Sequence, residues 1–310
     1  MGNQNKSLSS QEVADILHVS RSTIYELIRR GDIRSYRVGR KVRFTQDDVD
    51  AYIARSRHEH QAPLTEKAEV ASELLASEKK ERGLIISGQD VVLDFLAGEM
   101  AERGHWARRS YLSSFEGLLA LYEGRVDVVA CHLYDGAGYN ASFVRALMPG
   151  VAAVLVNVSL RKVGFYVRAE NPKGITGWED LKRRDIRLLN RRVGSSARIL
   201  LDTMLKKMDV AQKPAGYERV MKSHLTMAAA VAAGEADVAI GTERISRQMD
   251  GIDFIPLMEE RYDLVIKKED MAREDVQTML AVLRSKSFKE DIAHFSGNDY
   301  RFLGKVVEEV

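Results

Sequence analysis

Two short amphipathic helices are predicted near the start of the chain. The first follows Ser10, a residue type that caps helices, and spaces its apolar residues three to four positions apart up to Leu17. The second is predicted from Arg21 to Arg30, with Ser20 as its cap and Gly31 as its C-terminal stop. The pattern therefore predicts two helices joined by a tight turn.

A hairpin and a third helix follow these two helices. β-forming residues from Ile33 to Phe44 flank a turn at Gly39-Arg40, which predicts a hairpin with a cationic tip. Thr45 then caps a third helix, and Asp47 and Asp48 lie in its first turn, where the helix dipole favours negative charge. Residues 1–57 are therefore predicted to form a small helical domain with a β-wing.

Residues 58–82 are predicted to be a helical connector. They contain one Pro and no Gly, and from Thr65 onward they consist largely of Ala, Glu, Leu and Lys. Such a composition predicts a semi-rigid tether. A short apolar stripe on it is equally suited to pairing with a second copy and to packing on the domain that follows.

Residues 83–310 alternate strand-like apolar runs with amphipathic helices. The runs at 84–86, 126–130, 186–189 and 236–240 are each followed by a predicted helix, which is typical of an α/β fold with mainly parallel sheets. Residues 116–133 and 224–241 repeat one unit, in which a helix ends at Gly, an Asp follows three residues later, and a buried strand comes next. We interpret the repeat as one unit in each of two lobes.

Composition narrows the class of protein. With 310 residues, 45% hydrophobic and 30% charged, the chain fits about two globular domains. The longest apolar stretch, Gly150 to Val158, is far shorter than the roughly 20 residues that cross a bilayer. The single cysteine, Cys131, and the polar N-terminus without a signal sequence predict a cytoplasmic protein with no membrane association.

Charge is distributed unevenly between the two parts. Residues 1–57 carry 11 Lys and Arg against 7 Asp and Glu, whereas the remainder carries 36 against 38. A small basic segment ahead of a large near-neutral one indicates a polyanion-binding module joined to a domain of another kind.

The run SSQEVADILHVSRSTIYELIRRGDIRSYRVGRKVRFTQDDVDAYI, at 9–53, resembles the winged helix-turn-helix DNA-binding domain of the excisionase and MerR type. The resemblance implies that the helix beginning after Ser20 enters the major groove of double-stranded DNA and that the wing contacts the adjacent minor groove or phosphates. The residues expected to contact DNA are Arg21, Ser22, Thr23, Tyr25 and Arg29 on the helix, and Arg40 and Lys41 on the wing.

A second resemblance covers essentially all of residues 83–310. The segments at 113–135, 189–202 and 223–266 look like the type II periplasmic-binding-protein fold, in which two α/β lobes close on a small ligand. In particular they resemble cytoplasmic versions fused to helix-turn-helix domains or to molybdopterin-biosynthesis enzymes, which implies molybdate or tungstate as the effector. The predicted architecture is thus a winged helix-turn-helix domain followed by a two-lobed α/β domain.

Oxyanion chemistry indicates which residues would line such a cleft. A buried tetrahedral dianion is held by hydroxyls and by backbone amides at helix N-termini, and strand ends leading into helices are where ligands bind in α/β sheets. The predicted ligand-binding residues are Ser87, Ser113, Ser114, Ser195, Ser196, Arg198, Ser223 and Thr242. Each of these Ser and Thr residues is equally able to act only as a helix cap.

Two features leave the effector open. The family tends to have GSGTR where this chain has Gly194-Ser195-Ser196-Ala197-Arg198, so the hydroxyl expected at Ala197 is missing and a carboxylate ligand is also possible. Arg191, Arg192 and Arg198 are candidates to clamp an anion. An Arg-lined cleft would favour an organic acid and a purely hydroxyl-lined one an oxyanion.

Catalytic and metal motifs are not found in the sequence. It lacks Walker A, HExxH, GxSxG, CxxC and post-strand GxGxxG motifs, so no enzyme activity, resident cofactor or metal is predicted. Cys131-His132 has no further ligands at useful spacing, which favours a buried cysteine beside a histidine that lines the cleft.

The sequence therefore predicts a ligand-responsive transcriptional regulator that senses a small anionic effector. Because helix-turn-helix proteins commonly read paired half-sites, we expect a homo-oligomer. Two alternatives remain. One is the same regulator with a small organic acid or other metabolite as effector. The other is an excisionase-like architectural DNA-binding protein whose second domain docks a partner.

Overall fold

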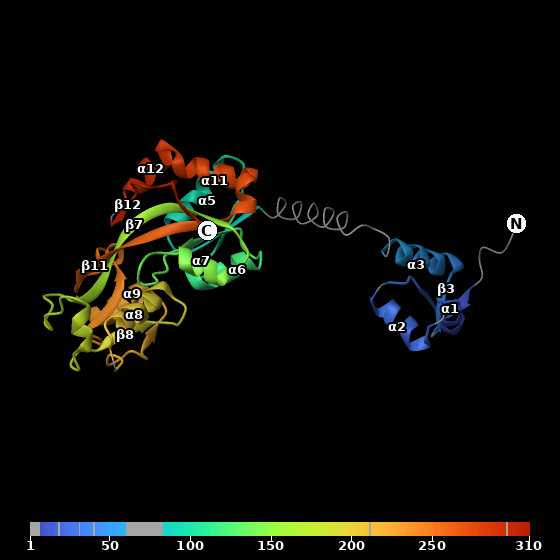
Figure 1. The fold of residues 1–310 in the computed structure, drawn as a ribbon, viewed down its shortest axis with the longest axis horizontal. Coiled ribbons are helices and arrows are strands. Elements are labelled where there is room, and N and C mark those ends of the chain that lie inside the picture. Colours follow the sequence, from blue (N-terminus) through green and yellow to red (C-terminus); the bar gives the residue numbers. More distant parts are fainter. Residues whose placement is uncertain are drawn as a thin grey trace. The chain divides into compact units, whose positions relative to one another are not determined.

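The computed structural model describes residues 7–59 except positions 18, 31 and 40, and residues 83–310 except positions 211 and 296. The chain divides into two compact units, Met1–Glu78 and Lys79–Val310 (Figure 1). The connector predicted at 58–82 lies, beyond residue 59, outside the described residues.

The first unit has the predicted helix-turn-helix and wing. Helices α1 (Ser10–Leu17) and α2 (Arg21–Arg30) precede the hairpin of β2 (Tyr36–Val38) and β3 (Lys41–Phe44), and α3 (Gln46–Glu59) follows it. A short strand that the sequence pattern did not predict, β1 (Leu8–Ser9), pairs with β3 and completes a three-stranded sheet. The apolar faces of these elements share one core, formed by Leu8, Val13, Ala14, Ile24, Ile33, Phe44 and Val49.

Helix capping in this unit matches the prediction at two of three positions. Ser20 Oγ accepts a hydrogen bond from the Thr23 amide, and Thr45 Oγ1 accepts one from the Asp48 amide. The prediction that Ser10 caps α1 is wrong, because Ser10 is itself the first helical residue. Ser9 caps the helix instead, by accepting from the Glu12 amide while the Glu12 carboxylate accepts from the Ser9 amide at 2.7 Å.

The second unit is a two-lobed α/β structure. Its strands form one ten-stranded sheet. Eight of them follow the order β5-β4-β6-β11-β7-β10-β8-β9, and the other two, β12 and β13, pair with β7. The first lobe contains β4 (Leu84–Ser87), α5 (Val92–Glu102), β5 (Ala107–Ser110), α6 (Ser114–Tyr122), β6 (Val128–Cys131), α7 (Ala141–Leu147), η2 (Lys268–Ala272), α11 (Glu274–Arg284), α12 (Lys286–Ala293), β12 (Asn298–Asp299) and β13 (Val306–Glu309). The second lobe contains η1 (Trp178–Lys182), β8 (Leu188–Arg191), α8 (Ser196–Lys207), β9 (Val220–Met221), α9 (His224–Ala232), β10 (Val238–Thr242) and α10 (Glu243–Ser246).

Two long strands pass from one lobe to the other. β7 (Ala153–Arg168) and β11 (Ile252–Lys267) pair antiparallel along most of their 16 residues, with irregularities between Pro256 and Met258 and between Tyr262 and Asp263. The predicted parallel pairing holds within each lobe, between β4 and its neighbours β5 and β6 and between β8 and its neighbours β9 and β10. The expectation of mainly parallel sheets did not include this long antiparallel pair.

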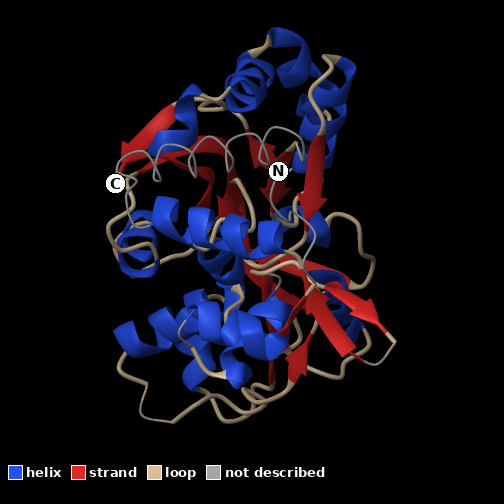
Figure 2. Cartoon of the chain, turned by 90° about the vertical axis from the view of Figure 1, so that its right-hand side faces the viewer, coloured by secondary structure: helices blue, strands red, loops and turns tan. Residues whose placement is uncertain are grey.

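Helices cover both faces of the sheet in each lobe (Figure 2), and their apolar side chains pack with those of the strands. In the first lobe, α5, α11 and α12 pack on one face, while α6 and α7 pack on the other. In the second lobe, α8 and α9 belong to separate core clusters, to which Phe165 and Tyr166, adjacent on β7, contribute from opposite faces. No helix among the described residues is long and apolar enough to span a bilayer.

The repeated unit found in the sequence has one structural role in both lobes. The helices α6 and α9 are each followed, two residues after the last helical residue, by a glycine, Gly124 and Gly234, whose φ angles of +73° and +75° favour glycine. Asp127 then accepts a hydrogen bond from the Ile85 amide at 2.9 Å, and Asp237 accepts one from the Arg187 amide at 2.8 Å. Each Asp thus ties its strand to the start of the neighbouring parallel strand.

Candidate functional site

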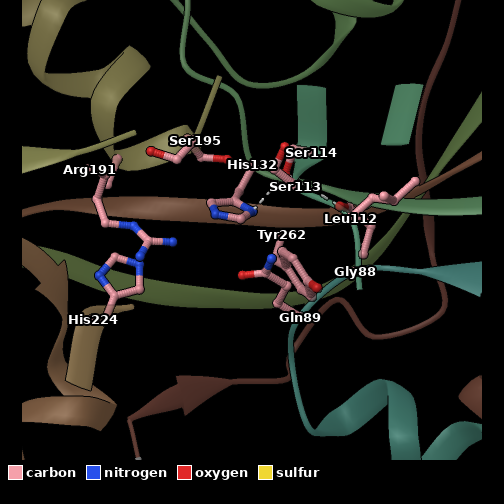
Figure 3. A pocket seen from close by; sticks show the side chains of 13 residues that line it. Gly88, Gln89, Leu112, Ser113, Ser114, His132, Arg191, Ser195, His224 and Tyr262 are labelled. Atoms are coloured by element: carbon pink, nitrogen blue, oxygen red, sulfur yellow. Dashed lines mark hydrogen bonds between the residues drawn. The ribbon is translucent and has the colours of Figure 1, made fainter. Parts of the chain in front are cut away.

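A small cleft lies where the two lobes meet (Figure 3). Three strands of the sheet lead into it with their carboxyl ends: Gly88 follows β4, His132 follows β6, and Arg191 ends β8. Ligands bind at this edge in open α/β sheets because the strand ends and the following helix starts converge there. The lining residues are Gly88, Gln89, Leu112, Ser113, Ser114, Ala130 and His132 from the first lobe, Arg191, Ser195, Ser196, Ala197 and His224 from the second lobe, and Tyr262 from β11.

Four of the predicted serines line this cleft. Ser113 caps α6 by accepting a hydrogen bond from the Glu116 amide, and Ser195 caps α8 by accepting one from the Arg198 amide. Ser196 donates from its hydroxyl to Ser114 Oγ at 3.2 Å, which joins the two lobes directly. The N-termini of two helices therefore border the cleft from opposite lobes, and their dipoles favour negative charge there.

Arg191 brings a buried positive charge to the cleft. It is only 6% exposed, its Nε has no hydrogen-bond partner, and one terminal nitrogen reaches the Met221 carbonyl only at 3.5 Å. Burial lowers the pKa of Arg191, and the neighbouring Arg192 lowers it further. No acidic side chain of the described residues forms an ion pair with Arg191, so the site has a cation that an anionic ligand would neutralise.

The next residue in the chain behaves differently. Arg192 is exposed and donates to the Glu116 carboxylate at 2.9 Å, across the mouth between α8 and α6. Because both partners are about half exposed, this ion pair contributes little to stability. It nevertheless joins the same two helix N-termini that Ser114 and Ser196 join inside the cleft.

Two histidines line the cleft, and both are held neutral. Burial lowers the pKa of His132 well below its usual value, with Arg161 adding to the effect, and His132 Nδ1 lies 3.2 Å from Ser114 Oγ. Burial also lowers the pKa of His224, to about 4, and the Arg191 charge contributes. His224 Nδ1 lies 3.2 Å from the Ile240 carbonyl oxygen. Figure 3 shows His224 beside the Arg191 guanidinium and His132 nearer to Ser114.

Next to the cleft, the two crossing strands hold a buried network of charges. Arg161 on β7 donates to Glu260 on β11, and also to Asp90 at 3.0 Å. The Arg161 guanidinium lies 4.1 Å from the centre of the ring of Tyr262, whose other contacts include the His132 ring. Burial raises the pKa of Glu260, while Arg161 opposes that shift. Arg244 adds a second cation to Asp90 at 3.3 Å, so these charges are neutralised within the protein.

The other four predicted ligand-binding residues do not line the cleft. Ser87 is fully buried, with its hydroxyl unpartnered and next to Gly117 of α6. Arg198 donates to Asp202 at 3.0 Å and lies 4.0 Å from the Tyr217 ring centre, so it is paired on α8. Ser223 caps α9 through the Thr226 amide. Thr242 ends β10 and accepts from Tyr166 through its carbonyl oxygen.

Several lining residues were not among the predicted binding residues. Gln89 lies two positions after the predicted Ser87, and His224 directly follows the predicted Ser223, so the sequence signal was one or two positions away. Tyr262 comes from a long strand that the pattern did not relate to a site. His132 lines the cleft as the sequence indicated, and of the three arginines considered as a clamp only Arg191 does so.

The candidate DNA-contacting residues cluster at the start of α2. Arg21, Ser22 and Tyr25 are exposed, Thr23 is half-buried, and Ile24 between them is buried in the core. The hydroxyls of Ser22 and Thr23 lie 2.6 and 2.8 Å from Ser20 Oγ, so the cap also orients them. The first turn of α2 therefore exposes one polar face away from the core.

The wing is described in part. Lys41 is exposed at the first position of β3, beside the hairpin turn that contains Gly39. Arg40 lies outside the described residues, and so does the side chain of Arg29. The geometry therefore places Arg21, Ser22, Tyr25 and Lys41 at the surface of this unit.

Comparison with known families identifies both parts of the chain. A model described as a PBP superfamily domain matches residues 97–284, and a helix-turn-helix domain model matches residues 7–57. The protein YvgK of Bacillus subtilis is 37% identical over 314 aligned positions, which cover 99% of each chain. Similarity to YvgK thus extends over both units.

Solved structures share the fold of the second unit. A phosphate transport receptor of Vibrio cholerae is 16% identical, with a TM-score of 0.51 over 70% of this chain and 99% of the receptor. A histidine kinase sensor domain similar to periplasmic binding proteins is 14% identical, with a TM-score of 0.52 over 71% of this chain and 98% of that domain. At such identities the likeness concerns the fold alone.

Proposed function

The chain belongs to the PBP superfamily, and from that premise we propose that it is a DNA-binding regulator whose two-lobed domain closes on a small anion. The helix-turn-helix domain supplies DNA binding, through the exposed first turn of α2 and the wing residue Lys41. The cleft between the two lobes binds the small anion.

The observation that carries the proposed ligand class is Arg191. Arg191 is a buried residue whose guanidinium has no carboxylate partner among the described residues, and such a charge costs free energy unless a ligand neutralises it. The helix N-termini at Ser113 and Ser195 add partial positive charge on the two sides of the same cleft. All three features favour a negatively charged ligand.

Two classes of effector fit such a cleft. Molybdate or tungstate is the first, supported by the resemblance of the sequence and by the hydroxyls of Ser113, Ser114, Ser195 and Ser196 around the cleft. A small organic acid is the second, supported by Arg191, because a guanidinium presents paired N–H donors that match a carboxylate.

Signal transfer in this proposal depends on lobe closure. The anion must bind the closed lobes more tightly than the open ones, because a ligand with equal affinity for both states shifts no population. Contacts from Ser196 to Ser114 and from Arg192 to Glu116 already join the lobes, and a bound anion would add bridging contacts of its own.

The proposal is tested by calorimetric titration of the full chain with molybdate, tungstate, sulfate and a set of small carboxylates. We expect at least one of these anions to bind, and Arg191→Gln to weaken that binding by roughly a hundredfold, since a buried charged hydrogen bond is lost. Arg184→Gln removes an exposed arginine of the same lobe outside the cleft and serves as the matched control. Unchanged binding in Arg191→Gln would contradict the assignment of the cleft.

DNA binding is measured on the same proteins by fluorescence anisotropy with a duplex selected from a random pool. A regulator requires that the anion change the affinity for this duplex, in either direction. Anion binding that leaves DNA affinity unaltered would argue against regulation.

A further inference from the structure

The hydrogen bond of His224 fixes which of its ring nitrogens carries a proton. Nδ1 lies 3.2 Å from the Ile240 carbonyl oxygen, and a carbonyl oxygen can only accept. Nδ1 must therefore be the protonated nitrogen. A neutral imidazole carries a single N–H, which leaves Nε2 with a free lone pair that accepts hydrogen bonds.

His224 stays neutral at physiological pH because of its surroundings. Burial and the Arg191 cation lower its pKa to about 4, with His132 contributing in the same direction, while Glu260 and the bond to Ile240 oppose the shift. Glu260 itself is engaged by Arg161, whose Nε lies 3.0 Å from it. His224 is thus neutral, with Nε2 unprotonated, when a ligand binds in the cleft.

The cleft therefore combines a donor with an acceptor. Arg191 supplies N–H donors, and His224, whose Nε2 accepts, lies beside the Arg191 guanidinium (Figure 3). The hydroxyls of Ser114 and Ser196 already donate within the protein, to the Ala130 carbonyl and to Ser114 Oγ. Among the described residues, the hydrogen bond from Nδ1 to Ile240 is the one seen for His224. An anion without protons would leave the Nε2 acceptor without a donor, at a cost typical of unsatisfied polar groups.

We propose that the ligand of this cleft is an anion that also carries a hydrogen-bond donor, with its negative group on Arg191 and its donor on Nε2 of His224. This inference rests on the proposed function and narrows its ligand class. Two kinds of small molecule share that chemistry. A tetrahedral oxyanion that keeps a proton, such as hydrogenphosphate, is one, and a hydroxycarboxylate is the other. Sulfate, molybdate and tungstate carry no proton near neutral pH and fall outside the class.

The test compares pairs of anions in which only one member carries a hydrogen-bond donor. Calorimetric titrations of the full chain at pH 7.5 use phosphate against sulfate, and lactate against propionate, with molybdate and tungstate added. We expect the donor-bearing member of at least one pair to bind about ten- to a hundredfold more tightly. The pair that shows the preference tells whether the ligand is an oxyanion or a carboxylate.

Variants of His224 link the preference to the proposed acceptor. His224→Leu removes the lone pair and should reduce the preference to less than about threefold, whereas His224→Gln offers an amide oxygen and should retain most of it. His294→Leu, at an exposed histidine that ends α12, is the matched control and should behave as the wild-type chain. Tryptophan fluorescence establishes that each variant is folded.

The outcomes separate this inference from the proposed function. Tight binding of molybdate, tungstate or sulfate with no preference for donor-bearing anions would overturn the inference and leave an anion-responsive regulator. A preference that persists in the folded His224→Leu variant would overturn it as well. If no anion in the panel binds, the anion cleft itself is wrong and the inference fails with it.

Discussion

His224 illustrates how single residues of the cleft combine stability with recognition. Its ring lies beside Arg191 (Figure 3), and the Ile240 carbonyl accepts from Nδ1, so the neutral form is the one that fits the folded protein. The same packing that exposes a lone pair to a ligand penalises the protonated ring. The free energy of unfolding should therefore depend on pH through the protonation of His224.

The first prediction concerns that dependence on pH. Because the pKa of His224 is about 4 in the folded protein and 6.5 in an unfolded chain, the unfolded state binds more protons between these values. The stabilisation is fully present above about pH 6.5 and is lost as pH falls toward 4. We expect the free energy of unfolding to be about 2 kcal/mol lower at pH 5 than at pH 7.5 from this group.

Urea denaturation followed by tryptophan fluorescence measures this change. Both tryptophans of the chain, Trp106 and Trp178, lie in the second unit, so the signal reports that unit. His224→Gln should show a smaller loss between pH 7.5 and 5, while His132, whose pKa is also lowered, accounts for the remainder. An identical pH dependence in wild type and variant would refute the assignment.

The sequence predicted those cleft residues whose signal is local. Ser113 and Ser195 each precede a helix, and capping patterns within four residues reveal such positions. The sequence also indicated His132 and Arg191 singly, but these two residues and His224 meet because two strands and a helix from two lobes converge, which no short pattern encodes. Ser223 and Thr242 carry the same local signal as the serines that do line the cleft, so the pattern could not separate a cap from a ligand-binding hydroxyl.

At the scale of elements, we expect helix α2 and the wing to have different roles in DNA binding. The first turn of α2 exposes Arg21, Ser22 and Tyr25 on one polar face, while Lys41 starts the second strand of the wing. A helix in the major groove reads base edges, and a wing cation neutralises phosphates without reading sequence. Both elements rest on the same small core, which includes Ile24 and Phe44.

The second prediction separates these two roles. Arg21→Ala should weaken binding to a selected duplex by about 1–3 kcal/mol, with little change on random DNA. Lys41→Ala should weaken binding to both and reduce the slope of log affinity against log salt by about 1. Fluorescence anisotropy at several salt concentrations measures both quantities. Equal losses on selected and random DNA for both variants would contradict the division.

Some elements could be predicted from the sequence, and others could not. The helices and the strands of each lobe followed from periodicity and capping, as at Ser20 and Thr45. β7 and β11 are each 16 residues long and are separated by the 83 residues from 169 to 251, and their pairing depends on which faces both lobes bury. Local periodicity contains no information on such a distant partner.

At the scale of the whole molecule, regulation requires that ligand occupancy alter the DNA-binding units. A helix-turn-helix protein commonly reads two half-sites about one helical turn apart, which needs two copies of the chain. Closure of the lobes around an anion would then change the spacing of the paired heads. The connector at 58–82 would carry that change between the units.

The third prediction is the oligomeric state. Light scattering of the full chain at working concentration should give a mass near twice 34.9 kDa, alone or on a duplex with two half-sites. Addition of the anion should change the affinity for that duplex more than for a duplex with one half-site. A strict monomer with and without DNA would refute this mechanism of signal transfer.

The crossing strands have a consequence for how the second unit folds. β7 leaves the first lobe and β11 returns to it beside β7, so the second lobe is an insertion whose two ends are neighbours. The cost of closing a loop rises with the length of free chain within it, and a folded insertion shortens that length. The second lobe is therefore expected to form early, and the first lobe to complete its sheet only after β11 has arrived. Folding kinetics would then be limited by this long-range pairing, and the cleft would be among the last features to form.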